Sequence, residues 1–500
     1  MSGGADAADS ANADRSGPAV AFAPSSPAIA RRFRHLTADE RVARGRAARN
    51  AVPRSSHGPW RPATNRLDPI GLLERQAESR VPDLVPIRHA RMAVSPFTFY
   101  RGGALIMAAD LAATPQSGIN VQLCGDAHLS NFGVFGSPER KLMFDINDFD
   151  ETLPGPWEWD VKRLAASFEI LGRELGFSRA DRRAIVTSCA RGYREQMRAA
   201  AGMRTLEAWY DHLDMAQVMD QVSSEVGEKR LGKKEAKEAG QDVAKAQTRD
   251  HIRVFSRLTG ERDGELRIAA DPPLIVPIDD LIGPGMARDD VEEWMRSLID
   301  LYRQSLADHH HPIEEFDYVD SARKVVGVGS VGTLAWIHLL VGRDNEDPLF
   351  LQSKEAQASV LERFVGTSEH SNHGRRVVVG QRLMQAASDI FLGWLRVTGL
   401  DGHTRDYYVR QLHDWKGGVE AETMQVPGAT FYAQLCGATL ARAHARWGDR
   451  IAVASYLGKS DAFDEAIADF AFAYADQNER DFEAFAEAIA SGRLAATDVS

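Results

Sequence analysis

Three polar side chains within one short stretch of the chain have the types and the spacing that phosphoryl transfer requires. Asp126 precedes Asn131 by five residues, and Asp145, which comes directly after an apolar residue, follows Asn131 by 14 residues. A carboxylate beside an acceptor hydroxyl can act as the base, and two further oxygen ligands can hold magnesium ions against the phosphates of a nucleotide. The spacing therefore predicts Asp126 as the catalytic base and Asn131 and Asp145 as metal ligands.

Two more carboxylates lie close behind the predicted metal ligand Asp145. Asp148 and Asp150 follow it within five residues, so any of the three could bind the metal. We assign Asp148 to the predicted metal site together with Asp145. The alternative is that these residues only stabilise turns, because Asx turns are common. The joint occurrence of Asp-x-x-x-x-Asn and a downstream aspartate favours the chemical interpretation.

A glycine-rich segment almost 200 residues downstream has the pattern of a phosphate-covering loop. Gly327, Gly329, Ser330 and Gly332 lie in the sequence Gly-Val-Gly-Ser-Val-Gly, and Lys354 follows on a later predicted strand. A dinucleotide-binding turn of this spacing would open directly into a helix, whereas strand-like sequence follows here. We therefore predict that these loop residues and Lys354 bind the phosphates of a nucleotide. A tight hairpin with a surface lysine is the alternative.

Other charged residues near these motifs are candidate partners. A phosphate-binding lysine on a strand is paired with a glutamate from the following helix. Glu362 is the predicted partner of Lys354 and is counted with the catalytic residues, and Glu355 is its rival. Arg101, in Tyr-Arg-Gly-Gly before the catalytic strand, can bind phosphate or hold a carboxylate of the acidic loop.

Periodicity divides the chain into a β-rich block between two helical blocks. Residues 1–35, rich in Ala, Ser, Gly and Asp, are expected to be a disordered tail. Residues 36–317 are predicted to form the first part of a helical lobe, which carries the catalytic and metal loops. A β-rich nucleotide-binding lobe is predicted over residues 318–415, and a hinge with the second part of the helical lobe over residues 416–500.

Read from about residue 320 to 447 and then from 121, the motifs follow the order of a protein kinase. They resemble the protein-kinase-like superfamily, in particular its aminoglycoside and small-molecule phosphotransferase branch. The resemblance implies a two-lobed, circularly permuted α+β fold with a small antiparallel β-rich lobe and a larger helical lobe. It also implies ATP and Mg²⁺ as cofactors. The chain departs from that pattern at Cys124, where the branch has histidine, and at Asp145-Ile-Asn, which lacks the glycine of the kinase metal motif.

Several phrases of the sequence also resemble a bacterial family called domain of unknown function 2252. They are Phe99-Tyr-Arg-Gly, Leu123-Cys-Gly-Asp-Ala-His, Asn147-Asp-Phe-Asp-Glu, Lys324-Val-Val-Gly-Val-Gly-Ser-Val-Gly and Tyr408-Val-Arg-Gln-Leu. This resemblance covers about residues 40–495. It implies no activity, so the expected chemistry depends on the residues themselves.

Composition limits the expected partners and location. The net charge of −11 gives no reason to expect nucleic acid or an anionic membrane as a partner. The three cysteines lie far apart in the sequence, which suits a reducing compartment, and no apolar run approaches the ~18 residues of a membrane span. We therefore expect a cytoplasmic protein whose partners are a nucleotide and a small-molecule acceptor.

The expected function is ATP- and magnesium-dependent transfer of a phosphoryl group to a hydroxyl of a small molecule. AMP transfer would use nearly the same nucleotide site, and a non-catalytic, ATP-binding pseudokinase is an alternative from a different class. A third alternative is a metal-dependent hydrolase built on Asp145, Asp148 and Asp150, which would leave the glycine-rich loop without a role.

Overall fold

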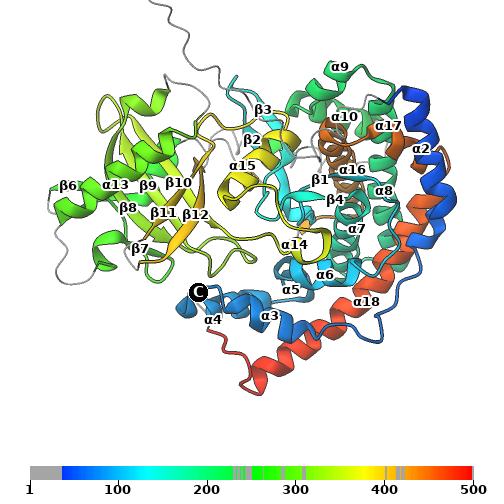
Figure 1. Cartoon of the computed structure of the whole chain (residues 1–500), viewed down its shortest axis with the longest axis horizontal. Helices are drawn as coiled ribbons and strands as arrows, with labels where there is room; N and C mark the ends of the chain where they lie inside the picture. The colour runs from blue at the N-terminus through cyan, green and yellow to red at the C-terminus, as the bar shows by residue number, and fades with distance from the viewer. Residues whose placement is uncertain are drawn as a thin grey trace, which may run out of the picture.

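The computed structural model describes residues 36–228, 251–262, 264–282, 288–306, 311–399, 402–412, 417 and 423–497, and the single residues 232, 237, 240 and 241. The expected disordered tail, residues 1–35, and part of the expected hinge lie outside these residues. The described chain has a β-rich part and a larger helical part that lie side by side (Figure 1). The predicted α+β class is confirmed.

The β-rich part is built on one six-stranded antiparallel sheet with the strand order β11-β12-β10-β9-β8-β7. Its strands are β7 (Ile275–Pro277), β8 (Asp317–Lys324), β9 (Ala335–Val341), β10 (Pro348–Ala356), β11 (Gly393–Thr398) and β12 (Thr404–Gln411). The edge strand β7 comes from a segment before the predicted start of the β-rich lobe at residue 318. The glycine-rich segment connects β8 to β9, as the sequence predicts.

Both faces of the sheet are covered, so its central strand β10 is buried almost throughout. Successive side chains of a strand point to opposite faces. Leu351 packs on one face with Tyr302 of α13 (Arg288–Arg303). Phe350 packs on the other face with Leu258 of α12 (His251–Leu258). The helix α15 (His373–Met384) also packs against this sheet.

The helical part combines segments from before and after the sheet in sequence (Figure 1). Its long helices are α7 (Trp157–Glu174), α8 (Arg179–Gly202), α16 (Val426–Trp447) and α18 (Ala462–Ala490). Helices α8 and α16 approach closely because glycines lie at their crossing. A Cβ at Gly437 would lie 2.1 Å from the Cys189 carbonyl oxygen, and one at Gly192 would lie 2.4 Å from that of Gln434. An alanine at either position would therefore force the two helices apart.

Shorter elements complete the two parts. In the first half of the chain they are α2 (Ala38–Ala51), α3 (Pro69–Ala77), α4 (Val85–Met92), α5 (Pro96–Gly102), α6 (Ala104–Leu111), α9 (Thr205–Tyr210) and α10 (Met215–Gly227). Later come β5 (Thr259–Arg262), β6 (Glu265–Ile268), α14 (Glu362–Val365) and α17 (Arg450–Leu457). The 3₁₀ helices are Arg54–His57, Pro82–Leu84, Leu129–Asn131, Ile278–Asp280 and Pro312–Glu315. Helix α2 packs against α17, so both ends of the described chain belong to the helical part.

Two helical segments near the motifs are short. Helices α5 and α6 are separated at Gly103, whose φ of −97° and ψ of 26° interrupt the helical path between them. The helix that carries Glu362 is only α14, of four residues, because β10 continues to Ala356. The substantial helix between β10 and β11 is α15.

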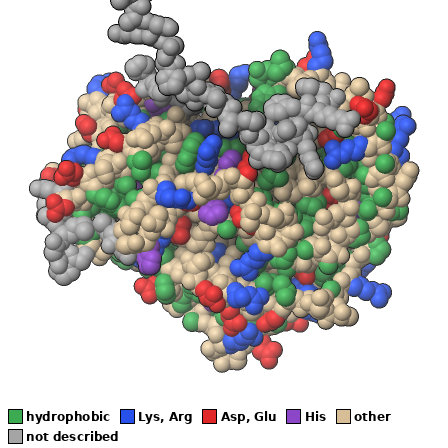
Figure 2. All heavy atoms as spheres, viewed as in Figure 1, with side chains coloured by type: hydrophobic (Ala, Val, Ile, Leu, Met, Phe, Trp, Pro, Cys, Tyr) green, Lys and Arg blue, Asp and Glu red, His purple; other side chains and the backbone are tan. Residues whose placement is uncertain are grey.

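The described surface carries charges of both signs. On the face shown in Figure 2, acidic and basic side chains are intermixed rather than gathered by sign. Among the helices that the structure describes, none offers the long apolar stretch that a bilayer-spanning segment requires.

Candidate functional site

The first turn of helix α7 anchors the loop that carries Asp126. Strand β1 (Asn120–Leu123) pairs with β4 (Leu153–Pro156), and the loop begins directly after β1. The Asp160 carboxylate, in the first turn of α7, accepts hydrogen bonds from the backbone N–H groups of Cys124 at 2.8 Å and Gly125 at 3.1 Å. Gly125 has a φ of +83°, and a Cβ there would lie 2.4 Å from the Glu151 carbonyl oxygen. Glycine is therefore required at this turn.

Asp126 is balanced by a buried arginine. The Arg163 Nε donates to Asp126 Oδ1 at 2.6 Å, and the Asn131 side-chain amide donates to the Asp126 carbonyl oxygen at 2.7 Å. Burial raises the pKa of Asp126 above its ordinary value, and the charge of Arg163 opposes that rise. His128 Nε2 lies 3.9 Å from Asp126 Oδ2, and burial holds the pKa of His128 well below its usual range, so this ring is neutral. The loop thus brings a carboxylate and a neutral imidazole together.

Lys354, which follows the glycine-rich loop, contacts Asp150 of the acidic segment, although more than 200 residues separate them in the sequence. The Lys354 Nζ donates to Asp150 Oδ2 at 2.6 Å. The Tyr408 hydroxyl donates to Asp150 Oδ1 at 2.5 Å, and the Ser330 hydroxyl donates to Asp150 Oδ2 at 3.2 Å. Burial disfavours the ionised form of Asp150, but the charge of Lys354 outweighs it and lowers the pKa of Asp150 to about 2. The predicted meeting of Lys354 with the acidic segment is therefore present in the structure.

The predicted carboxylate partner of Lys354 is wrong. The Glu362 carboxylate accepts a hydrogen bond from the Ser359 N–H at 3.4 Å and lies 3.9 Å from His373 Nδ1. The rival, Glu355, accepts from the Leu334 N–H at 3.0 Å. Because side chains alternate along β10, Glu355 points to the face opposite Lys354. Asp150 takes the position that the sequence assigned to a glutamate.

The predicted metal role of Asp145 is also contradicted by its position. Asp145 lies in β3 (Leu142–Ile146), which pairs with β2 (Phe132–Gly136) as the predicted hairpin. Its carboxylate accepts the N–H groups of Ala386 and Ile146, each at 2.9 Å, and lies 3.9 Å from Arg446 Nη1. β3 continues to Ile146, so Asp145 still belongs to the strand. Its side chain points toward Ala386 and Arg446 rather than toward the loop that follows β3. Asp148, three residues later, lines both of the cavities at this loop, and Asp150 lines one of them.

Two cavities meet at this loop. We call the first, of about 520 Å³, the lysine cavity; its lining includes Lys324, Gly327, Ser330, Gln352, Lys354 and Arg410. We call the second, of about 910 Å³, the aspartate cavity; its lining includes Arg101, Asp126, His128, Asn131, Gly329 and Glu362. Asp148, Gly327 and Ser330 line both, whereas Asp145 lines neither. Both volumes lie in the range of small-molecule sites.

The glycine-rich loop lies between the two cavities. Gly327 and Gly332 have φ values of +69° and +96°, which favour glycine. The loop is attached to the helical part, because the Arg91 Nη1 donates to the Gly327 carbonyl oxygen at 2.6 Å and the Val81 N–H donates to that of Gly332 at 2.7 Å. Of the predicted set, Gly327 and Ser330 line both cavities and Gly329 lines the aspartate cavity, whereas Gly332 lines neither.

Several residues of this site were missed by sequence reasoning. Arg163, described above, comes from a segment with no motif of its own, and Tyr408 belongs to a family phrase to which the sequence assigned no role in the site. Arg376 of α15 is buried and donates to the carbonyl oxygens of Thr152 at 2.8 Å, Asp150 at 2.7 Å and Gln357 at 2.9 Å. It thus joins the acidic loop to the end of β10. No local pattern distinguishes such an arginine from a surface residue of a helix.

Arg101 lies at the aspartate cavity, where its positive charge opposes the rise in the pKa of Asp126.

Comparison with known proteins places the chain in a family without adding a structural relative. No solved structure matches it, and no curated protein matches it. A family model described as "Uncharacterized protein conserved in bacteria (DUF2252)" matches residues 80–488. The match spans the loop that carries Asp126, the glycine-rich loop and the sheet, and the chain belongs to this family.

Proposed function

We propose that this protein is a kinase-like phosphotransferase that moves a phosphoryl group from magnesium-bound ATP to a hydroxyl of a small molecule. The observation that supports it most is the border between the two cavities. Asp148, Gly327 and Ser330 line both, with Lys354 on one side and Asp126 on the other. A nucleotide in the lysine cavity would direct its terminal phosphate toward an acceptor in the aspartate cavity.

The arrangement of elements supports a permuted kinase-like fold. The glycine-rich loop, the lysine strand β10, helix α15 and strands β11 and β12 follow one another, and α16 comes after them in sequence. The loop bearing Asp126 lies far upstream in the sequence, yet α16 packs against α7 and α8, which follow that loop.

The donor set fits magnesium held partly by the nucleotide. Within the described residues, no group of three or more His, Cys, Asp or Glu side chains is arranged to hold a metal ion. Magnesium in nucleotide sites typically uses one or two carboxylates, phosphate oxygens and water rather than an all-protein cage. Asp148 and the side-chain oxygen of Asn131 would supply the protein ligands. Magnesium bound there would neutralise charge that develops on the phosphates.

The remaining residues divide into binding and proton transfer. Lys354 would exchange its partner Asp150 for phosphate oxygens, and Ser330 would lie beside them. Asp126 would take the proton of the acceptor hydroxyl as that oxygen bonds to the γ-phosphorus. The bond from that phosphorus to the bridging oxygen breaks at the same time, and ADP leaves. Arg163 keeps Asp126 ionised for this role.

The hydrolase alternative has less support. It needs Asp145, Asp148 and Asp150 around one ion, but Asp145 binds the Ala386 and Ile146 N–H groups and Asp150 binds Lys354. It also gives no role to Gly327 and Ser330, which line both cavities.

The test is turnover of ATP labelled at the γ or the α phosphate, with magnesium and a panel of sugars, amino alcohols and nucleosides. We expect γ-label to move to an acceptor or to water, and this transfer to be lost in Asp148→Asn. Asp220→Asn, an exposed carboxylate on α10, is the matched control. Transfer of α-label would instead show AMP transfer. ATP binding without transfer of either label would show a pseudokinase.

A further inference from the structure

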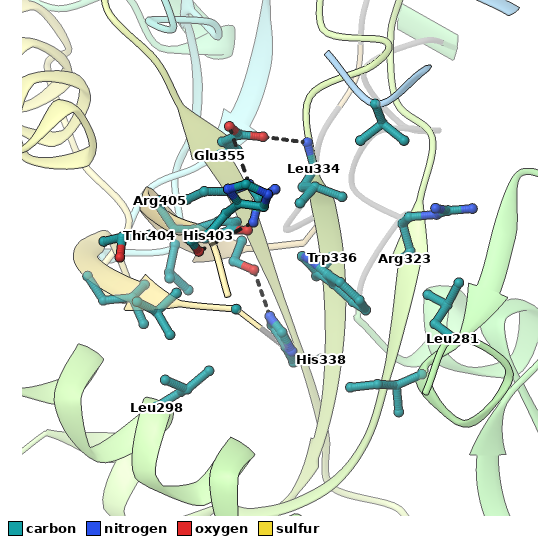
Figure 3. A pocket seen from close by; sticks show the side chains of 18 of the residues that line it. Leu281, Leu298, Arg323, Leu334, Trp336, His338, Glu355, His403, Thr404 and Arg405 are labelled. Carbon is teal, nitrogen blue, oxygen red and sulfur yellow. Dashed lines mark hydrogen bonds and ion pairs between the residues drawn. The ribbon is translucent and has the colours of Figure 1, made fainter. Parts of the chain in front are cut away.

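A third cavity lies on the other face of the sheet, between the strands and α13 (Figure 3). We call it the α13 cavity; its volume is about 1010 Å³. Strand alternation separates it from the lysine cavity, because Ser353 and Glu355 line the α13 cavity while Gln352 and Lys354 line the lysine cavity. The proposed nucleotide site leaves this space without a role.

One end of the α13 cavity is apolar and rich in aromatic rings. Trp294, Leu298 and Tyr302 line it from α13, and Trp336, Leu351 and Leu395 line it from the sheet. Figure 3 shows Leu298 on the α13 side of the cavity and Trp336 on the sheet, with Leu281 beside Arg323. Such a surface favours an apolar ligand body, at roughly 25 cal/mol for each Å² of apolar surface removed from water.

The cavity also carries an excess of positive charge. Three arginines, Arg80, Arg323 and Arg405, line it together with two glutamates, Glu78 and Glu355. Arg323 lies opposite Trp336 in the register of β8 and β9, so it borders the aromatic surface. Glu355 accepts the Leu334 N–H at 3.0 Å and lies 3.8 Å from Arg405 Nε (Figure 3). Glu78 is exposed to solvent. The arginines of the cavity therefore outnumber its carboxylates.

Arg80 and Arg323 are the two arginines with the fewest partners there. The Arg80 Nη1 donates to the Val331 carbonyl oxygen, while the Nε atoms of both residues are buried without an acceptor. No ion pair joins either of them to an acidic side chain of the described residues. Burial lowers the pKa of Arg80 to about 10, so it remains charged at neutral pH. Both side chains are half-buried, and a bound anion would give these partly desolvated charges an ionic partner.

The neutral polar side chains in the middle of the cavity already have hydrogen-bond partners within the protein. His338 binds the Ser321 hydroxyl at 2.7 Å through Nδ1 and the Ser353 hydroxyl at 2.8 Å through Nε2. Burial lowers the pKa of His338 to about 4, so this ring is neutral at physiological pH. Only the arginines can therefore select a ligand by its charge.

We propose that the α13 cavity binds a small amphipathic anion, with its apolar chain or rings against α13 and its carboxylate or phosphate head at Arg80 and Arg323. This site is independent of the proposed transferase activity. It differs from the acceptor site, although Arg80 and Glu355 line both the α13 cavity and the aspartate cavity.

The test is calorimetric titration of the full chain with decanoate, decyl phosphate, decanol and decylamine. We expect decanoate and decyl phosphate to bind at least tenfold more tightly than decanol, and decylamine not to bind. The tighter of the two anions identifies the preferred head group. Failure of both anions to bind, or equal binding of decanol, would overturn the proposal. Competition by ATP for decanoate would also overturn it, because decanoate would then occupy the lysine cavity.

Two variants locate the binding. Leu298→Trp fills the cavity from α13 and should reduce decanoate affinity at least tenfold. Leu301→Trp is the matched control on the same helix, because Leu301 is 41% exposed. Arg323→Met should bring decanoate affinity down to that of decanol, and this decides the question even if Leu298→Trp fails to fold. Unchanged decanoate binding in Arg323→Met would contradict the proposed head-group site.

Discussion

The lysine cavity and the aspartate cavity share a border at Asp148, but their buried charges are balanced in different ways. Lys354, which lines the lysine cavity, and Asp150, which lines the aspartate cavity, neutralise each other at 2.6 Å across the border. In the aspartate cavity, the partner of Asp126 is Arg163 of α7, which stands outside that cavity and over the ring of Tyr100 at 4.3 Å. A cation that binds phosphate must be able to change partners, whereas the partner of a base must stay in place. Under the proposed function, this difference fits phosphate binding at Lys354 and proton transfer at Asp126.

The largest expected effect is that of Asp126→Asn on turnover. Loss of a general base typically costs 10²–10⁴ in rate, and Asp126 does not line the lysine cavity. We expect turnover of γ-labelled ATP to fall by about that factor while ATP affinity, measured by calorimetry, stays within about twofold. Asp220→Asn provides the control. If ATP binding falls as far as turnover, the division between the two cavities is wrong.

Lys354→Met tests the other side of the comparison. It should abolish ATP binding and also lower the free energy of unfolding, because Asp150 would remain in the site without its cation. Removing one partner of a buried ion pair costs ~3–5 kcal/mol, and we expect about 3 kcal/mol because the Asp150 side chain is 26% exposed.

Urea unfolding at pH 7 measures this loss. Adding Asp150→Asn to Lys354→Met should restore part of the stability, because the unpaired charge is then removed. A loss below about 1 kcal/mol in the single variant would contradict the importance of this pair.

Asp148→Asn and Asp145→Asn form a matched pair that sharpens the border between the cavities. ATP at 100 times its dissociation constant should stabilise the wild-type chain by about 2.7 kcal/mol. We expect Asp148→Asn to lose the magnesium-dependent part of this gain with little change in the ligand-free protein. Asp145→Asn should lower ligand-free stability but keep the response to magnesium. Thermal unfolding with ATP, with and without magnesium, distinguishes them, and the reverse pattern would restore Asp145 as the metal ligand.

The smallest expected effect concerns Glu151, which also lines the aspartate cavity. Burial raises the pKa of Glu151 to about 7 from an ordinary value of 4.5. The folded state then holds this proton more tightly than the unfolded state, so stability falls as pH rises from about 4.5 to about 7. Glu151→Gln should remove that fall, worth about 2 kcal/mol, in urea unfolding compared at pH 5 and pH 8. An equal pH dependence in both proteins would show that Glu151 ionises freely.

The sequence predicted the main parts of the candidate site from local patterns. The hairpin after Asn131, the glycine-rich loop between two strands and the position of Lys354 on the strand that follows them are present. These features depend on strand alternation and on glycine conformations, which act within a few residues. The sequence also predicted that Lys354 lies near the acidic segment, because phosphoryl transfer needs a phosphate-binding lysine and metal-binding carboxylates in one site.

The identity of interacting carboxylates was less predictable. Asp145, Asp148 and Asp150 differ by only a few positions, and the end of β3 decides which of them turns away from the cavities. Glu362 follows β10 closely enough to suggest a partner, but it lies in the short helix α14 and binds the Ser359 N–H. One residue more in a strand reverses the direction of a side chain.

The sequence by itself determined the α+β class, the family and most of the residues of the candidate site. Only the tertiary structure decided that Asp150 pairs with Lys354, that Asp148 lies on the border of two cavities, and that Arg163 supports Asp126. The physical reason is that residue type and spacing fix which chemistry is possible locally. Contacts across 200 residues depend instead on how helices and strands pack, and burial then sets the charge of each group.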